Sequence, residues 1–228
     1  MNITERINRI ITLGFYDRLT TPMPHVVVSH LVAAGNPGKY QAVSVFNYPL
    51  PSEIDYDGQI YNTRDAQTYS VSGSSMSPED VYNGDELIVF PCNADEIQTG
   101  DYIVIEVDRK YFVHKHGVEP VFKYKLRKAL VPVPAGQNDE EIETRLIDNL
   151  VPLYDELSLE EYQVELREDL RDALHFYGNA PLFASITYKE GRIHYSFHPQ
   201  SAIKFRVVRI ARKTRGDVEL LCPVRTLN

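Results

Sequence analysis

The sequence contains only two cysteines, Cys92 and Cys222, and no apolar run that approaches the length of a membrane span. Two cysteines give no disulfide framework, so a reducing cytoplasm is the simplest setting. A membrane-spanning helix needs about 20 consecutive apolar residues, and the first residues lack the long apolar segment of a signal peptide. We therefore expect a cytoplasmic protein without a membrane partner.

Two further classes are disfavoured by what is missing. His114, His116 and His175 are scattered without the spacing of a metal site, so we expect neither a metal nor an organic cofactor. Residues 1–23 contain one short helical pattern and are too few for a helix-turn-helix domain, which needs about three helices. We therefore expect no direct DNA binding.

The charge of the chain is uneven. The net charge is −8 over 228 residues, and residues 137–172 carry 13 acidic and 3 basic residues, a local balance of −10. Residues 204–215 carry six basic residues and no acidic one. A solvated strand pair beside an acidic helical surface explains this pattern better than a nucleic-acid-binding stripe.

The most informative stretch is Ser72-Gly73-Ser74-Ser75-Met76-Ser77-Pro78-Glu79-Asp80-Val81-Tyr82-Asn83-Gly84-Asp85, followed by the apolar residues 87–90. It predicts a strand at 68–71, a sharp bend, an exposed serine, a polar turn and a second strand. Gly73 can adopt backbone angles that a side chain forbids, so the next hydroxyl can be pushed out of the sheet. A serine in such a turn is often only a turn residue, and the function depends on the longer pattern.

This longer pattern resembles the Ser-Met-x-Pro…Gly-Asp signature of the LexA/UmuD family of self-cleaving Ser-Lys peptidases, which share a β fold with signal peptidases. The resemblance implies that Ser75 is the nucleophile. A second Gly-Asp string, Gly100-Asp101, opens a strand pair that in this family delivers the lysine, and residues 32–37 resemble the cleavage site, with the scissile bond between Ala34 and Gly35. The similarity covers about residues 26–115 and is weaker beyond.

The general base is expected to be Lys115. A serine hydroxyl needs a base, and a lysine can serve only when burial against apolar strands favours its neutral form. Lys115 follows Phe112-Val113 in a segment that we predict to be a strand. Counting the family's usual distance from Asp101 reaches His114 instead, so His114 is an alternative base, and Lys110 is a weaker one.

The residues next to Ser75 are expected to support the reaction. Backbone N–H groups around Ser74 and Ser75 could form an oxyanion hole, because the bend exposes them. Met76 is expected to pack into the sheet and fix the bend.

The predicted fold is mostly β (α+β), a LexA/signal-peptidase-like domain at residues 35–228 with an N-terminal arm at 1–34. A helical hairpin insertion is expected at about 118–188. Asn138 and Glu141 form a capping-box pattern before one helix, Ser158 and Glu161 form another, and Gly178 predicts the end of the second helix. The leucine stripes of both helices are expected to be core.

Together these features predict a self-cleaving protease that cuts its own N-terminal segment as a damage-response switch. The resemblance implies that a recombinase filament on single-stranded DNA triggers cutting, and that the protein is a homodimer. Two alternatives remain: a transcriptional repressor of the phage/LexA type, and a non-catalytic dimeric binding module on the same fold.

Overall fold

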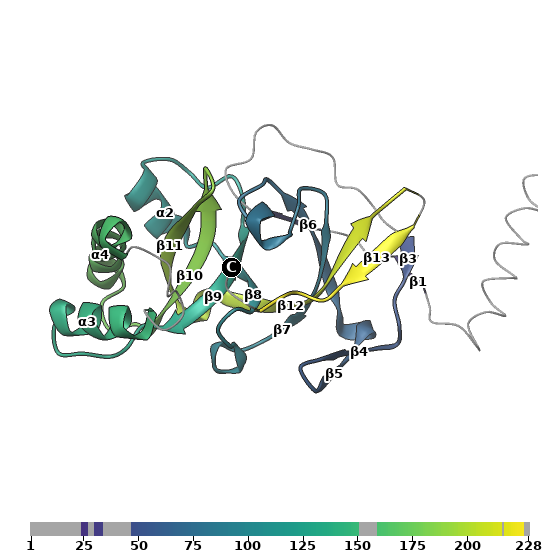
Figure 1. Cartoon of the computed structure of the whole chain (residues 1–228), viewed down its shortest axis with the longest axis horizontal. Coiled ribbons are helices and arrows are strands. Elements are labelled where there is room, and N and C mark those ends of the chain that lie inside the picture. Colours follow the sequence, from purple (N-terminus) through teal and green to yellow (C-terminus); the bar gives the residue numbers. More distant parts are fainter. Residues whose placement is uncertain (1–23, 27–29, 34–46, 151–158, 216, 226–228) are drawn as a thin grey trace, which may run out of the picture.

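The computed structural model describes residues 24–26, 30–33, 47–150, 159–215 and 217–225 (Figure 1). The strands in chain order are β1 Pro24–Val26, β2 His30–Ala33, β3 Asn47–Pro49, β4 Glu53–Tyr56, β5 Gln59–Asn62, β6 Gln67–Ser72, β7 Glu86–Pro91, β8 Tyr102–Glu106, β9 Tyr124–Pro132, β10 Leu182–Lys189, β11 Arg192–Pro199, β12 Ile203–Lys213 and β13 Val218–Leu221. The α-helices are α2 Arg109–His116, α3 Asp139–Leu150 and α4 Leu159–Tyr177.

Nine strands form one curled, mainly antiparallel sheet. Its order is β11-β10-β9-β2-β6-β7-β12-β13, and β8 pairs with both β12 and β9. The pairings β2-β6-β7-β12-β8-β9 therefore form a closed cycle, in which the only link between β9 and β2 among the described residues is the pair Ala33–Lys125. The predicted β-rich α+β class is confirmed.

Two cores follow from this arrangement. The strands of the closed cycle enclose a core that includes Tyr69, Met76, Tyr102, Leu126 and Val207. A second core lies between α3 and α4 on one side and β10 and β11 on the other (Figure 1). Because a strand directs successive side chains to opposite faces, β9 presents residues to both faces of the sheet.

The helical hairpin is confirmed, but its predicted bounds are wrong. Residues 124–132 and 182–189 of the expected insertion are β9 and β10 of the main sheet, so the helical part runs from Asp139 to Tyr177. Asn138 caps α3 by accepting a hydrogen bond from Glu141 N at 2.9 Å. Leu146, Leu150, Leu166 and Leu170 of the stripes are buried as expected, and Leu174 is partly buried against the same core. Ser158 lies outside the described residues.

The predicted strand at residues 111–115 is also wrong, because this segment belongs to α2. The Asp108 carboxylate accepts hydrogen bonds from the backbone N–H groups of Lys110 and Tyr111, which caps the helix at its start. Gly117 ends the helix in the left-handed conformation at φ 69°. An aspartate before and a glycine after the helix are its ordinary end signals, so they outweigh the strand propensity of Tyr111 and Val113.

Both Gly-Asp strings have the same construction. Asp85 accepts a hydrogen bond from Tyr82 N at 2.8 Å, and Asp101 accepts one from Gln98 N at 2.9 Å. Each buried carboxylate also pairs with an arginine of β12, Asp85 with Arg212 at 2.8 Å and Asp101 with Arg206 at 3.1 Å. The Gly-Asp strings therefore fasten β12 to the turns that precede β7 and β8.

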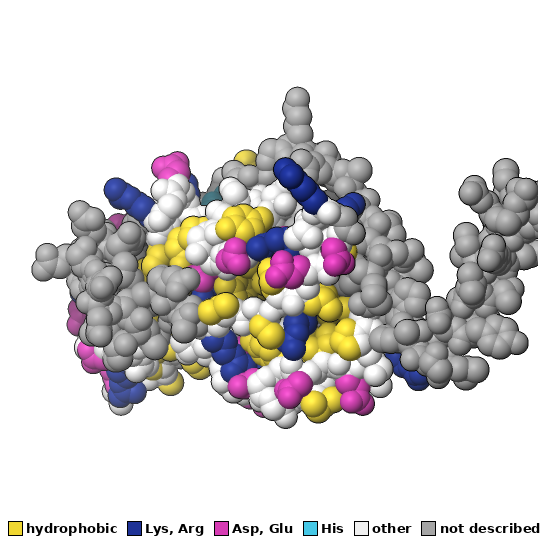
Figure 2. All heavy atoms as spheres, turned by 45° about the vertical axis from the view of Figure 1, so that its right-hand side comes forward, with side chains coloured by type: hydrophobic (Ala, Val, Ile, Leu, Met, Phe, Trp, Pro, Cys, Tyr) yellow, Lys and Arg dark blue, Asp and Glu magenta, His cyan; other side chains and the backbone are white. Residues whose placement is uncertain are grey.

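The basic segment 204–215 is thus partly used inside the fold. Arg206 and Arg212 are committed to the carboxylates just described, and Lys204 forms an ion pair with Glu106 at 3.4 Å. On the face shown in Figure 2, acidic and basic side chains are interspersed. The expectation of a solvated strand is therefore wrong for β12, which is largely buried between neighbouring strands, and its arginines are not arranged as a nucleic-acid-binding stripe.

The expected helix near the N-terminus and both residues of the expected scissile bond, Ala34 and Gly35, lie outside the described residues. Among the residues that the structure describes, no helix is both long and apolar enough to cross a membrane.

Candidate functional site

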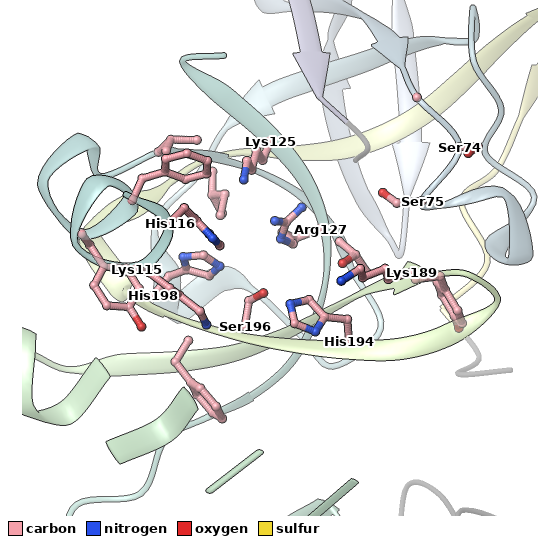
Figure 3. A pocket seen from close by; sticks show the side chains of 18 of the residues that line it. Ser74, Ser75, Lys115, His116, Lys125, Arg127, Lys189, His194, Ser196 and His198 are labelled. Carbon is pink, nitrogen blue, oxygen red and sulfur yellow. The ribbon is translucent and has the colours of Figure 1, made fainter. Parts of the chain in front are cut away.

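A cleft of about 940 Å³ lies between the Ser75 turn, α2, β9 and the β10–β11 hairpin. Ser74, Ser75, Lys115, Lys125 and Arg127 all line it (Figure 3). The structure therefore brings the predicted nucleophile and the predicted base into one cleft, together with two basic residues of β9 that the sequence did not single out.

The serine turn follows β6 directly. Gly73 has φ 103°, a conformation that glycine adopts readily. Its N–H donates to the Asn83 side chain at 3.1 Å, and this hydrogen bond holds the bend in place. The hydrogen bonds within the turn use the N–H groups of Ser77 and Glu79, which donate to the carbonyls of Ser74 and Met76 at 3.0 Å each. The N–H groups of Ser74 and Ser75 take no part in those bonds.

The three residues around the bend have different surroundings. Ser75 Oγ is buried and has no hydrogen-bond partner among the described residues. Ser74 is exposed at the edge of the cleft, and Met76 is fully buried in the core of the closed cycle. The prediction that Met76 packs into the sheet is confirmed.

A buried polar cluster holds this turn in place. Glu79, in the short 3-10 helix Ser77–Glu79, pairs with Lys128 of β9 and accepts a hydrogen bond from the Tyr188 hydroxyl. Tyr102 donates to the Glu79 carbonyl at 3.0 Å, and Tyr188 N donates to the Ser75 carbonyl at 2.8 Å. Burial and the neighbouring Glu79 raise the pKa of both tyrosines, so their hydroxyls stay protonated donors. The turn is thus anchored to β8, β9 and β10.

Lys115 lacks the environment that its predicted role requires. It lies on α2, and its Nζ is 2.7 Å from the Asp169 carboxylate of α4. Its Nζ is therefore engaged with α4 and not with Ser75. In Figure 3, Lys115 lies at the end of the cleft away from Ser75. These contacts indicate a structural role for Lys115 in holding α2 against α4.

The alternative bases are no better placed. His114 Nε2 is 2.9 Å from Asp172 Oδ1 of α4, and neither His114 nor Lys110 lines the cleft. Successive residues of a helix point about 100° apart, so His114 contacts Asp172 of α4 while Lys115 lines the cleft.

Lys125 has the properties that were expected of Lys115. It projects from β9 into the cleft, with its Nζ 4.4 Å from the centre of the Phe112 ring. It forms no ion pair among the described residues. Burial, followed by the positive charges of Arg127 and Lys115, lowers the pKa of Lys125 from 10.5 to about 7. A substantial neutral fraction is therefore present at neutral pH.

Arg127 is the second residue of β9 that faces the cleft. It stands two residues after Lys125 and therefore on the same face of the strand. Its side chain is 7% exposed, its Nε has no hydrogen-bond partner among the described residues, and its Nη1 donates to the Leu126 carbonyl at 2.8 Å. Desolvation lowers the pKa of Arg127 to about 10, so it remains a cation near neutral pH.

The chain's own segment β2 passes between the two strands that carry these groups. It pairs in parallel with β6 from His30–Tyr69 to Ala33–Ser72, and Ala33 also pairs with Lys125. The last described residue before the expected scissile bond therefore lies between the strand that leads to Ser75 and the strand that carries Lys125.

Comparison of this chain with protein-family models, with curated proteins and with solved structures finds no match. The functional assignment therefore depends on the site itself.

Sequence reasoning missed Lys125 because it assigned residues 118–188 to a single insertion. A usable signal was present: Asp108 and Gly117 mark a short helix, and the next β-prone run, residues 124–132, is then the partner of β8. Lys125 is the first lysine of that strand, and its register opposite Ile105 places it toward the cleft.

Proposed function

We propose that this protein is a self-cleaving serine peptidase in which Ser75 is the nucleophile and Lys125 is the general base. The observation that carries the proposal is the position of β2, whose Ala33 pairs at once with Ser72 and with Lys125. A peptidase binds its substrate as an extended strand beside the nucleophile, and β2 is an extended segment of the chain between the strands that lead to Ser75 and carry Lys125. The expected scissile bond, Ala34–Gly35, follows immediately.

The reaction would proceed in two steps. Neutral Lys125 accepts the proton of Ser75 Oγ as this oxygen attacks the Ala34 carbonyl carbon, and the resulting ammonium returns the proton to the Gly35 nitrogen as the peptide bond breaks. Water then hydrolyses the Ala34–Ser75 ester, which releases the N-terminal arm and restores the serine. The N–H groups of Ser74 and Ser75 are the candidates for the oxyanion hole.

The Glu79–Lys128 cluster takes no part in the proposed reaction and supports it only by holding other groups in place. It ties the turn that carries Ser75 to β9, the strand that carries Lys125. Two catalytic groups held by a common buried cluster need little reorganisation before reaction. Met76 adds an apolar anchor directly beside the nucleophile.

The test is an incubation of the purified full chain, followed by mass spectrometry of the products. The expected result is a fragment that begins at Gly35, absent in Ser75→Ala and in Lys125→Ala. Lys115→Ala is the matched control: it removes a lysine from the same cleft and should keep cleavage within about threefold. Cleavage that survives Lys125→Ala and is lost in Lys115→Ala would return the role of base to Lys115.

The resemblance to the LexA/UmuD family adds the trigger and the assembly to this proposal. Addition of a recombinase filament on single-stranded DNA should then accelerate the appearance of the Gly35 fragment, whereas the DNA alone should not. Sedimentation of the Ser75→Ala chain tests the expected homodimer.

A non-catalytic binding module is the second candidate, and one observation favours it. Ser75 Oγ is not hydrogen-bonded to Lys125, and the permanently charged Arg127 shares the cleft with both. A full chain that stays intact between pH 6 and 10, with or without the filament, would support the binding module. No comparable observation favours a repressor.

A further inference from the structure

The cleft contains a cluster of basic side chains that lack a counter-ion. Lys125, Arg127 and His198 line the same end of the cleft (Figure 3). Within the described part of the chain, neither Lys125 nor Arg127 forms an ion pair with a carboxylate, and the buried Nε2 of His198 has no hydrogen-bond partner. Burying a cation without a partner is strongly unfavourable, because the charge loses its hydration and gains nothing in return.

The other strongly buried cations of the described residues are paired, so the cluster is an exception within its own structure. Lys128 pairs with Glu79, and Arg206 pairs with Asp101 at 3.1 Å. The fold thus supplies a carboxylate to each of these two buried cations. At Arg127 the described part of the fold supplies none, although the net charge of the chain is −8.

The remaining charged groups of the cleft do not neutralise the cluster. Lys115, His116, Lys189 and His194 add further basic groups. The acidic residues of the lining are Asp108, whose carboxylate caps α2, and Glu190, which is exposed at the turn between β10 and β11. An anion that enters the cleft would therefore meet a cationic surface with no competing carboxylate from the described lining beside Arg127.

We propose that this end of the cleft is a carboxylate-binding subsite in which Arg127, Lys125 and His198 hold the carboxylate of a peptide. A guanidinium presents N–H donors in a planar fork that matches a carboxylate, and the unpartnered Nε of Arg127 is one of these donors. His198 has a depressed pKa because of burial and the nearby cations, so it is neutral and can donate one N–H without adding charge.

The direction of β2 identifies the peptide. β2 runs parallel to β9 with Ala33 beside Lys125, so a bound peptide strand that continued past this point in the same direction would run from Lys125 toward Arg127. A peptide that ends one residue after Ala33 would present its terminal carboxylate between these two cations. The product arm of the proposed cleavage has such an end, but the subsite depends only on the cationic cluster and does not require Ser75 to be active.

The test uses the full chain with Ser75→Ala, in which no cleavage can occur. Its melting temperature is measured with increasing sodium acetate at constant ionic strength, with acetamide as the neutral isostere and inorganic phosphate as the competing anion. A ligand that binds only the folded state raises the melting temperature, so acetate at about ten times its dissociation constant should raise it by about 3 °C. Acetamide should have no such effect.

Matched variants decide whether the cluster is responsible. Arg127→Gln should abolish the acetate effect and Lys125→Gln should weaken it, whereas Arg192→Gln, an exposed arginine on β11 outside the cleft, should retain it. N-acetylalanine, which carries the expected terminal carboxylate but does not need to replace β2 as a strand, should act at lower concentration than acetate, and N-acetylalanine amide should not act. No acetate effect, an unchanged effect in Arg127→Gln, or a stronger effect of phosphate would overturn the proposal. Because Ser75 is absent, these outcomes are independent of whether the protein is a peptidase.

Discussion

The pH dependence of self-cleavage tests the assignment of Lys125 most directly. Only a neutral lysine can accept the proton of Ser75, so the rate should follow the neutral fraction of the base. With a pKa of about 7, about half of Lys125 is neutral at pH 7, whereas a lysine with the ordinary value of 10.5 would be neutral in about one molecule in 3000. Cleavage should therefore rise about tenfold per pH unit below pH 6 and level off above about pH 8.

A second variant tests the influence of Arg127 on the pKa of Lys125. Arg127 is the largest charge that depresses the pKa of Lys125, after burial. Arg127→Gln should therefore raise the pKa of Lys125 and move the midpoint of the profile to higher pH, with the same plateau. On the acidic side of the midpoint, the cleavage rate at a given pH should fall in proportion to the smaller neutral fraction of Lys125. Arg192→Gln is the matched control and should leave the profile unchanged.

The assay is the single-turnover rate of formation of the Gly35 fragment between pH 5 and pH 10. A rate that keeps climbing to pH 10 would show that the base is an exposed lysine. A profile that survives Lys125→Ala would refute the assignment outright, and its loss in His114→Ala would identify the histidine instead.

The remaining predictions concern stability and are measured by urea unfolding. Lys128→Met should lower the free energy of unfolding by about 3–5 kcal/mol, because it leaves Glu79 buried without its cation. Adding Glu79→Gln should recover most of this loss, and a loss under about 1 kcal/mol would contradict the buried pair. Arg127→Met should leave stability unchanged or raise it, since no carboxylate is orphaned; a loss above about 2 kcal/mol would reveal a partner. Gly100→Ala should lower the free energy of unfolding clearly more than Gly58→Ala. Both glycines have positive φ, but a Cβ on Gly100 would lie 2.0 Å from the Arg225 carbonyl oxygen, whereas a Cβ on Gly58 would meet nothing within 4 Å. Equal costs would show that the turn at Gly100 can relax.

Much of the local structure could be predicted from the sequence because the signals were local. The strand–turn–strand around Ser75 follows from Gly73 and from the alternation of apolar residues, and α3 follows from the cap at Asn138 and its leucine stripe. Such features depend on a few neighbouring residues, whose conformational preferences act over a single turn or strand.

The identity of the candidate base depended on tertiary structure. Lys115 and Lys125 lie ten residues apart, both close to hydrophobic residues, and the sequence made Lys115 the better choice. Their difference is created by distant segments: α4 brings Asp169 to Lys115, while β8 and the β10–β11 hairpin bury Lys125 next to Arg127. A lysine's charge state depends on solvent and on opposite charges within a few ångströms, and those neighbours are set by how the strands and helices pack.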